Sequence, residues 1–195
     1  MTRRADAEEN RTALLDAAAQ VFAETGIDTP LERVHQRADV GRGTLYRHFP
    51  DRRSLFRALV AQSLDRLEAC AVEDDPAALA NLLHLAARES ARTPALHAIW
   101  DALRGDPDAA DLVGRLTGIF ARPLAQGQCA GWIGHEVTMD DLFIAVRMLG
   151  AACRGPDLET RAADARRALV ILIAGLGLPR PAPLEMTDDT RNRYP

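Results

Sequence analysis

Helix-capping residues recur at short intervals along this 195-residue chain and restrict it to a series of connected helices. Gly26 follows an apolar helical pattern as a left-handed C-terminal cap. Thr29 and Glu32, which flank Pro30 at the first helical position, have the spacing of a capping box. Further helix starts are predicted at Asp51, Asp75-Pro76, Thr93-Pro94, Asp106-Pro107 and Thr138.

Composition favours the same fold class. The chain has 35 Ala and 25 Leu against 9 Val and 7 Ile, so helix formers far outnumber β-branched residues. We predict an all-α protein of about nine helices. Their approximate ranges are 9–25, a short helix from Pro30 to just before Asp39, 42–48, 51–72, 76–91, 94–104, 107–125, 138–153 and 158–176.

No segment predicts a membrane or secretory route. The longest apolar run, Ala168 to Leu178, is 11 residues, shorter than the roughly 20 that a span needs. The N-terminus leads into Glu8 and Glu9 instead of an apolar segment, so we expect a cytoplasmic protein. The three cysteines, Cys70, Cys129 and Cys153, fit no metal or disulfide pattern, so free and mostly buried thiols are expected, with no metal and no cofactor.

Charge is unevenly distributed along the chain. All 24 basic residues are Arg, and 28 acidic residues bring the net charge to -4. Residues 30–57 nevertheless contain seven Arg and three acids, Glu32, Asp39 and Asp51. Such a cluster is typical either of a solvated helix face or of a surface that binds phosphates.

The motif inside this window favours DNA. Two short helices joined by a tight turn form a helix-turn-helix, whose second helix fits the major groove. Here that helix spans Gly41 to Phe49, with Leu45 and Phe49 spaced to pack inward. Gly43 lets a backbone approach DNA, and Arg52 and Arg53 open the next helix near a phosphate-binding dipole. The outward residues are Arg42, Thr44, Tyr46, Arg47 and His48.

At these positions the sequence resembles the tetracycline-repressor (TetR) family. The resemblance runs from Leu14-Leu15-Asp-Ala-Ala-Ala-Gln-Val-Phe22 to Val40-Gly-Arg-Gly-Thr-Leu-Tyr-Arg-His-Phe-Pro50 and covers roughly the first 60 residues. It implies a homodimer with an N-terminal DNA-binding domain and a ligand-sensing domain that dimerises through its last two helices. It also implies phosphate contacts from Tyr46, His48 and Arg52, base contacts from Arg42, Thr44 and Arg47, and a place for Thr29 and Gly43 in the DNA-binding set.

Several residues depart from the usual family pattern, among them Arg52, which replaces a frequent Lys and preserves the charge. His35 replaces a small residue, Asp39 replaces the glycine of the turn, and Gly41 replaces a Ser or Thr cap. Asp tolerates the left-handed conformation, so the turn should survive. His35 is interpreted as a hydrogen-bonded or partly exposed histidine, with a pH-sensitive role in DNA binding as the alternative.

The last two helices carry apolar residues on more than one face. Ala168 to Leu178 is apolar all round, so one buried stripe does not account for it. A central core helix and a dimer surface both explain this pattern, and the family resemblance favours the dimer.

The middle helices mix aromatic and polar residues in the manner of a ligand pocket. His84 and Arg88 belong to this mixture, although such residues are also common in cores or simply hydrogen-bonded. His135-Glu136 lacks the second His of a zinc hydrolase motif, so we predict no enzyme. The predicted ligand contacts are His97, Trp100, Phe120, Phe143 and Arg147.

Three segments are predicted: a DNA-binding domain over 1–52, a ligand-binding and dimerisation domain over 53–178, and a mobile tail over 179–195. The expected function is a ligand-responsive regulator, most simply a repressor that a small molecule releases from a palindromic double-stranded operator. Two alternatives stay open: a helical small-molecule binder or enzyme with a non-functional helix-turn-helix, and an architectural DNA binder without a ligand response.

Overall fold

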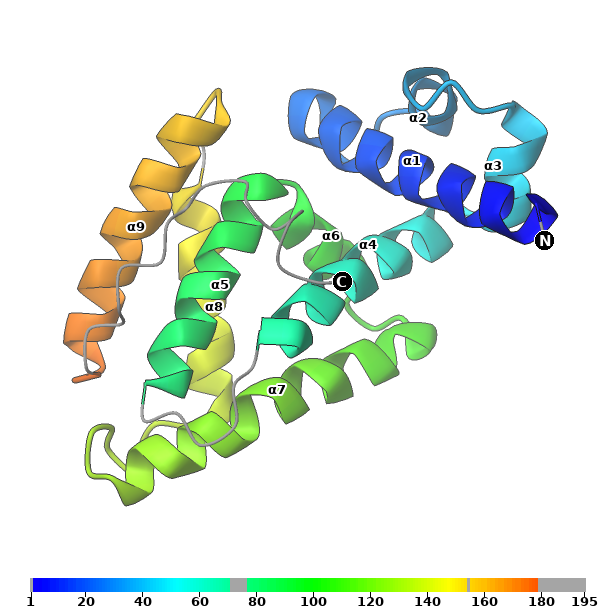
Figure 1. The fold of residues 1–195 in the computed structure, drawn as a ribbon. Coiled ribbons are helices and arrows are strands. Elements are labelled where there is room, and N and C mark those ends of the chain that lie inside the picture. Colours follow the sequence, from blue (N-terminus) through cyan, green and yellow to red (C-terminus); the bar gives the residue numbers. More distant parts are fainter. Residues whose placement is uncertain (1, 71–76, 154, 179–195) are drawn as a thin grey trace. The chain divides into compact units, whose positions relative to one another are not determined.

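A computed structural model describes residues 2–70, 77–153 and 155–178, and every regular element within those ranges is helical. The all-α prediction is therefore confirmed for the described chain (Figure 1). The elements are α1 (Thr2–Thr25), α2 (Leu31–Arg37), α3 (Arg42–His48), α4 (Arg52–Cys70), α5 (Ala78–Arg92), α6 (Leu96–Ala102), the 3-10 turn η1 (Pro107–Ala109), α7 (Ala110–Cys129), α8 (Met139–Ala152) and α9 (Leu158–Gly175).

Several of the predicted caps end or begin helices as expected. Gly26 has a φ of +86°, and its N–H donates to the Phe22 carbonyl at 3.0 Å. The Asp51 carboxylate accepts the Ser54 N–H at 2.6 Å at the start of α4. At α8, Thr138 and Asp141 exchange side-chain and backbone hydrogen bonds as a capping box. These local signals work because each cap satisfies an amide or carbonyl within one turn of it.

Other predicted ends are wrong. The capping box at Thr29 does not form, because Pro30 is the N-cap of α2 and makes no side-chain cap bond. Thr93 does not cap α6, which begins after Ala95. Helix α1 starts at Thr2, well before residue 9. The predicted start at Asp75-Pro76 and the tail 179–195 lie outside the described residues.

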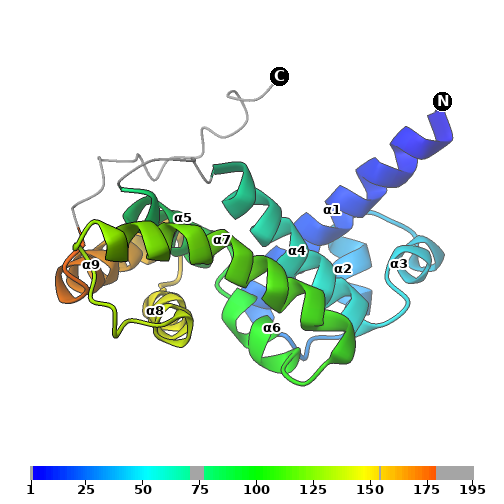
Figure 2. The same ribbon diagram turned by 90° about the horizontal axis from the view of Figure 1, so that it is seen from below.

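One compact unit comprises residues 1–69 and 93–119. In it, α2 and α3 both pack beside α1 (Figure 1), and Figure 2 shows α3 nearly along its axis. Phe22 of α1 meets Phe56 of α4 edge to face, with ring centroids 5.6 Å apart. Arg115 of α7 bridges Asp65 and Glu68 of α4 at 2.6 and 2.7 Å. This unit therefore joins α6, η1 and the first half of α7 to the N-terminal helices.

The described residues of the second compact unit are 70, 77–92, 120–153 and 155–178, and in it α5, α8 and α9 pack against one another. Arg161 of α9 donates from Nε to the carbonyl of Ala91 at the end of α5, at 2.8 Å. The residues that α9 buries follow one narrow stripe: Ala162, Ala165, Leu169 and Ile173. The two units are defined by packing. The predicted functional segments, with boundaries after residues 52 and 178, are a separate division and stay predictions.

The two described thiol side chains have opposite exposure. Cys153 is buried as expected, its thiol donates to the Leu149 carbonyl, and burial together with the charge of Asp164 raises its pKa to about 11. Cys129 is exposed, so the expectation of mostly buried thiols fails there. The difference arises because Cys129 is the last residue of α7.

Candidate nucleic-acid interface

The turn between α2 and α3 is built around Asp39 and His35. Asp39 has a φ of +52°, which is the left-handed conformation expected of it in this turn. The Val40 N–H donates to the His35 carbonyl at 3.0 Å, and the His35 ring nitrogen Nδ1 lies 3.1 Å from the Val40 carbonyl. With its hydrogen on Nδ1, the His35 ring donates to the Val40 carbonyl, so the side chain of His35 adds a second hydrogen bond across the turn. This contact explains how a histidine replaces a small residue here and agrees with its interpretation as hydrogen-bonded.

Helix α3 is held by one apolar side and presents the other to solvent. Leu45 is fully buried and Phe49 nearly so, as their spacing predicted. The opposite side carries Arg42, Gly43, Tyr46 and Arg47, which are exposed, with Thr44 and His48 half-buried at its edges. Because the buried side fixes the rotation of α3 about its axis, all six predicted contact residues of this helix share one accessible surface.

The exposed side chains of α3 contact one another. The Arg42 guanidinium lies over the Tyr46 ring, 5.6 Å from its centroid, and 3.6 Å from Glu32. Arg47 donates to the Thr44 hydroxyl at 2.8 Å. Contacts of this exposed kind contribute at most about 1 kcal/mol each. They order the side chains and can be exchanged for contacts with a partner.

No steric contact within the protein requires a glycine at the position of Gly43. A Cβ placed there would have no heavy atom within 4 Å beyond its own helix and chain neighbours. A larger residue would thus fit the free protein, and the missing side chain leaves room for another molecule to approach the start of α3.

The arginines of the basic window divide into structural and accessible groups. Arg37 binds Glu24 through two bonds, at 3.0 and 2.7 Å, and these hydrogen bonds lower the pKa of Glu24. Arg52 is half-buried and donates from Nη1 to the Ile27 carbonyl. Outside the window, Arg11 of α1 lies over the Phe49 ring, 5.5 Å from its centroid. That cation beside α3 was not predicted, and no local sequence signal marks it.

Thr29 lies apart from the surface of α3. It is buried, and its hydroxyl donates to the Thr25 carbonyl at 3.0 Å while lying 2.8 Å from the Thr25 hydroxyl. Its N–H donates to the Gly26 carbonyl at 3.3 Å. Thr29 therefore fastens the end of α1, and its role as a DNA contact stays a prediction.

The five predicted ligand residues fall in different parts of the chain. His97 and Trp100 are half-buried on α6, in the first compact unit. Phe120 is fully buried on α7, in the second unit, where half-buried Phe143 and exposed Arg147 lie one turn apart on α8. Neither unit holds all five, and their role in ligand binding stays a prediction.

His84 of α5 stands out more than any of these five. It is only 7% exposed, and neither ring nitrogen has a hydrogen-bond partner among the described residues. Burial and the positive charges of Arg88 and Arg166 lower its pKa, so the ring is neutral at physiological pH. The residues around His84 in the sequence do not indicate this isolation, because α8 and α9, the helices that pack against α5, come much later in the chain.

The described residues contain neither a candidate metal cluster nor a helix that could span a membrane. No cluster of three or more His, Cys, Asp or Glu side chains there is arranged to hold a metal ion. No described helix is both long and apolar enough to cross a bilayer.

Comparisons with known proteins agree with this geometry. Residues 14–59 match the model of the bacterial regulatory proteins of the tetR family. A helix-turn-helix transcriptional regulator of Staphylococcus aureus strain USA300 is 36% identical over 63 residues, which span 32% of this chain and 34% of that protein. The chain thus matches only about a third of the length of its curated relatives.

Solved structures resemble the chain over most of its length. A TetR transcriptional regulator from Streptomyces coelicolor is 29% identical, covers 85% of this chain and 97% of its own, and superposes with a TM-score of 0.59. A TetR regulatory protein from Mycobacterium vanbaalenii is 27% identical, covers 89% and 98%, and has a TM-score of 0.57.

Proposed function

We propose that this chain, whose residues 14–59 match the tetR family model, is a DNA-binding transcriptional regulator of that family that responds to a small molecule. The observation that carries the proposal is the two-sided helix α3. Its apolar side is buried, and its other side gathers cations and hydroxyl groups at a helix-turn-helix. Such a helix fits the major groove of B-DNA, which is about 12 Å wide.

The accessible residues divide into two roles. Arg42, Thr44 and Arg47 contact bases, and their guanidinium and hydroxyl donors suit the acceptors of the major groove. Tyr46 and His48 bind phosphates and set the register of the helix, with Gly43 at the close approach. Arg52 binds phosphate with the N–H groups that the Ile27 carbonyl leaves free.

A homodimer places two copies of α3 on successive grooves of a palindromic operator. Exposed apolar residues support an interface on the last two helices: Ile144 and Met148 of α8, and Val170 and Ile171 of α9. A solvated surface seldom carries so many large apolar side chains on adjacent helices, whereas a two-fold interface buries them in pairs.

The ligand response is that of a repressor. A small molecule bound by Phe120, Phe143 and Arg147, the predicted contacts that share the second compact unit, favours a dimer whose α3 helices no longer match the groove spacing. It lowers DNA affinity only by the ratio of its affinities for the two states. Selection of bound genomic fragments, followed by release with candidate metabolites, tests this step.

Binding of labelled DNA at increasing salt tests the DNA-binding function. A regulator loses affinity steeply as salt rises, because phosphate contacts release counterions. Arg42→Ala should cost about 1–3 kcal/mol and relax specificity at one base pair, whereas Arg52→Ala should weaken all sequences alike and reduce the salt slope by about one.

Circular dichroism must first show that Arg52→Ala keeps its helices, since Arg52 also holds Ile27. Identical behaviour of the two variants would contradict the division of roles. Catalytic turnover without any salt-dependent DNA binding would contradict the regulator itself.

A further inference from the structure

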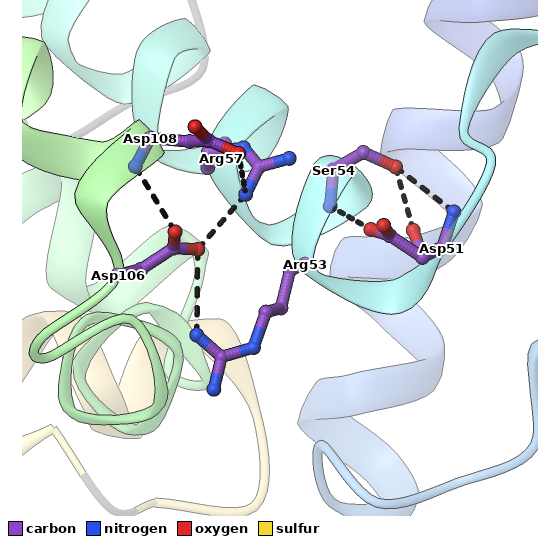
Figure 3. Close-up of polar contacts among 6 residues, drawn as sticks. All are labelled: Asp51, Arg53, Ser54, Arg57, Asp106 and Asp108. Atoms are coloured by element: carbon purple, nitrogen blue, oxygen red, sulfur yellow. Dashed lines mark hydrogen bonds and ion pairs between the residues drawn. The ribbon is translucent and has the colours of Figure 1, made fainter.

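Two arginines of α4 converge on one carboxylate from a distant part of the chain. Arg53 and Arg57 lie one turn apart on α4 and both reach Asp106, which precedes η1 (Figure 3). All of these residues belong to the first compact unit, which also contains the helix-turn-helix. Asp106 is only 5% exposed at its side chain, so its negative charge requires firm partners.

Arg57 and a backbone amide supply those partners. Arg57 Nη1 donates to Asp106 Oδ2 at 2.8 Å, and the Asp108 N–H donates to Asp106 Oδ1 at 3.1 Å. Burial alone would raise the pKa of Asp106, but these donors and the nearby Arg53 outweigh it and hold that pKa below its ordinary value. The carboxylate therefore stays charged, and it has a bond to each oxygen without Arg53.

Arg53 makes the weaker contact. Its Nη1 lies 3.5 Å from Asp106 Oδ2, longer than a normal hydrogen bond, and its side chain is 57% exposed against 23% for Arg57. An exposed ion pair at that distance is readily exchanged for another anion. Asp106 loses little when Arg53 leaves, because Arg57 remains.

Arg53 is also close in sequence to the proposed interface. It is the second residue of α4 and follows the last residue of α3, His48, by five positions. Arg52, its neighbour, is half-buried and held by the Ile27 carbonyl, so Arg53 has the more exposed side chain at this helix start. A long, exposed arginine at the start of the helix that follows α3 is well suited to a phosphate.

We propose that Arg53 is a phosphate-binding residue and that Asp106 is an internal anion which competes with DNA for it. This inference rests on the proposed DNA-binding function and identifies Asp106 as a residue that weakens DNA binding at the proposed interface. In the free protein Arg53 pairs with Asp106, and in the complex it turns to a phosphate oxygen while Arg57 keeps Asp106 in place. Asp106 thereby lowers the affinity for DNA of any sequence.

The test compares Arg53→Ala, Asp106→Asn and the double variant in the full chain. Binding of a fluorescent DNA duplex of mixed sequence is followed by anisotropy at several salt concentrations. Asn keeps an acceptor that can cap η1, so Asp106→Asn should fold, and circular dichroism checks it. Arg53→Gln repeats the charge removal with a longer side chain in case Arg53→Ala does not fold.

Two matched controls remove similar charges elsewhere. Asp65→Asn removes one negative charge from the ion pair with Arg115, and Arg122→Ala removes an exposed arginine of α7 in the other compact unit. They measure the effect of net charge alone.

Arg53→Ala should reduce the salt slope by about 0.9 for each bound subunit, which removes a factor of roughly 3.5 per subunit from the affinity change between 50 and 200 mM salt. Asp106→Asn should raise affinity roughly 1.4- to 5-fold beyond Asp65→Asn, and this gain should vanish in the double variant. An unchanged slope in Arg53→Ala, or an Asp106→Asn gain that persists without Arg53, overturns the inference. Absence of salt-dependent binding by the unaltered chain would instead refute the proposed function.

Discussion

Replacing Ile171 by Arg tests the proposed dimer surface on α8 and α9. Ile171 is 69% exposed on α9 in the single chain, the largest exposure among the described large apolar residues. An arginine there keeps good helix propensity and meets water in the monomer, so the stability of the subunit should change by less than about 0.5 kcal/mol. Any large effect must therefore arise from association.

The expected magnitude follows from the exposed fraction. Burying an isoleucine side chain completely is worth about 1.5–3 kcal/mol, so burying the 69% still exposed is worth about 1–2 kcal/mol per subunit. A two-fold interface contains Ile171 of both subunits, so the substitution should cost about 2–4 kcal/mol of association free energy. This cost raises the dimer dissociation constant roughly 30- to 900-fold. Desolvation of the introduced charge adds to this cost, so the figure is a lower bound.

Sedimentation equilibrium at micromolar concentration measures the outcome. The unaltered chain should sediment at twice its 21.3 kDa, and Ile171→Arg should move toward the monomer mass. Val113→Arg is the matched control, because Val113 is an exposed apolar residue of α7, outside α8 and α9. A monomeric unaltered chain, or an Ile171→Arg dimer as tight as the original, would refute the assignment of this surface.

Three further substitutions test a buried histidine, a helix cap and the apolar anchor of α3. His84→Leu should raise the free energy of unfolding by about 1–3 kcal/mol at neutral pH, because it removes two unpartnered buried nitrogens. Folding lowers the pKa of His84, so the unfolded chain takes up its proton first and the free energy of unfolding should fall as pH drops below about 6.5. Urea unfolding between pH 5 and 8 should show a smaller fall in the leucine variant. An equal dependence of stability on pH in the two proteins would count against the argument. Asp51→Ala should lose about 0.5–2 kcal/mol by removing the cap of α4, measured by the same unfolding. Leu45→Ala should lose about 2–5 kcal/mol and abolish DNA binding by loosening α3, and retention of full binding would show that α3 does not need this anchor.

The positions of most helices could be predicted from the sequence to within a few residues, the exception being the start of α1, which lies at Thr2 instead of residue 9. Caps such as Gly26 and Asp51 act on amides and carbonyls one turn away, so the information that they need is local. The inward spacing of Leu45 and Phe49 likewise gave the orientation of the DNA-reading helix, because a helix repeats every 3.6 residues.

The capping box at Thr29 shows where local reasoning fails. Thr29 has the right spacing to Glu32, yet its hydroxyl meets Thr25 at the end of the preceding helix and leaves α2 without a side-chain cap. A hydroxyl forms its hydrogen bond with whichever partner the path of the chain brings closer, and this path depends on how α1 and α2 pack.

Caps, periodicity and charge are properties of neighbouring residues, so the all-helical fold, the helix-turn-helix and its basic surface follow from the sequence alone. The accessibility of each arginine depends instead on how the helices pack. Arg37 meets Glu24 across 13 residues, and Arg57 meets Asp106 across 49. An arginine side chain is long, and its partner is whichever anion or carbonyl the fold brings within reach, so a count of charges along the chain cannot separate a structural guanidinium from one left for DNA.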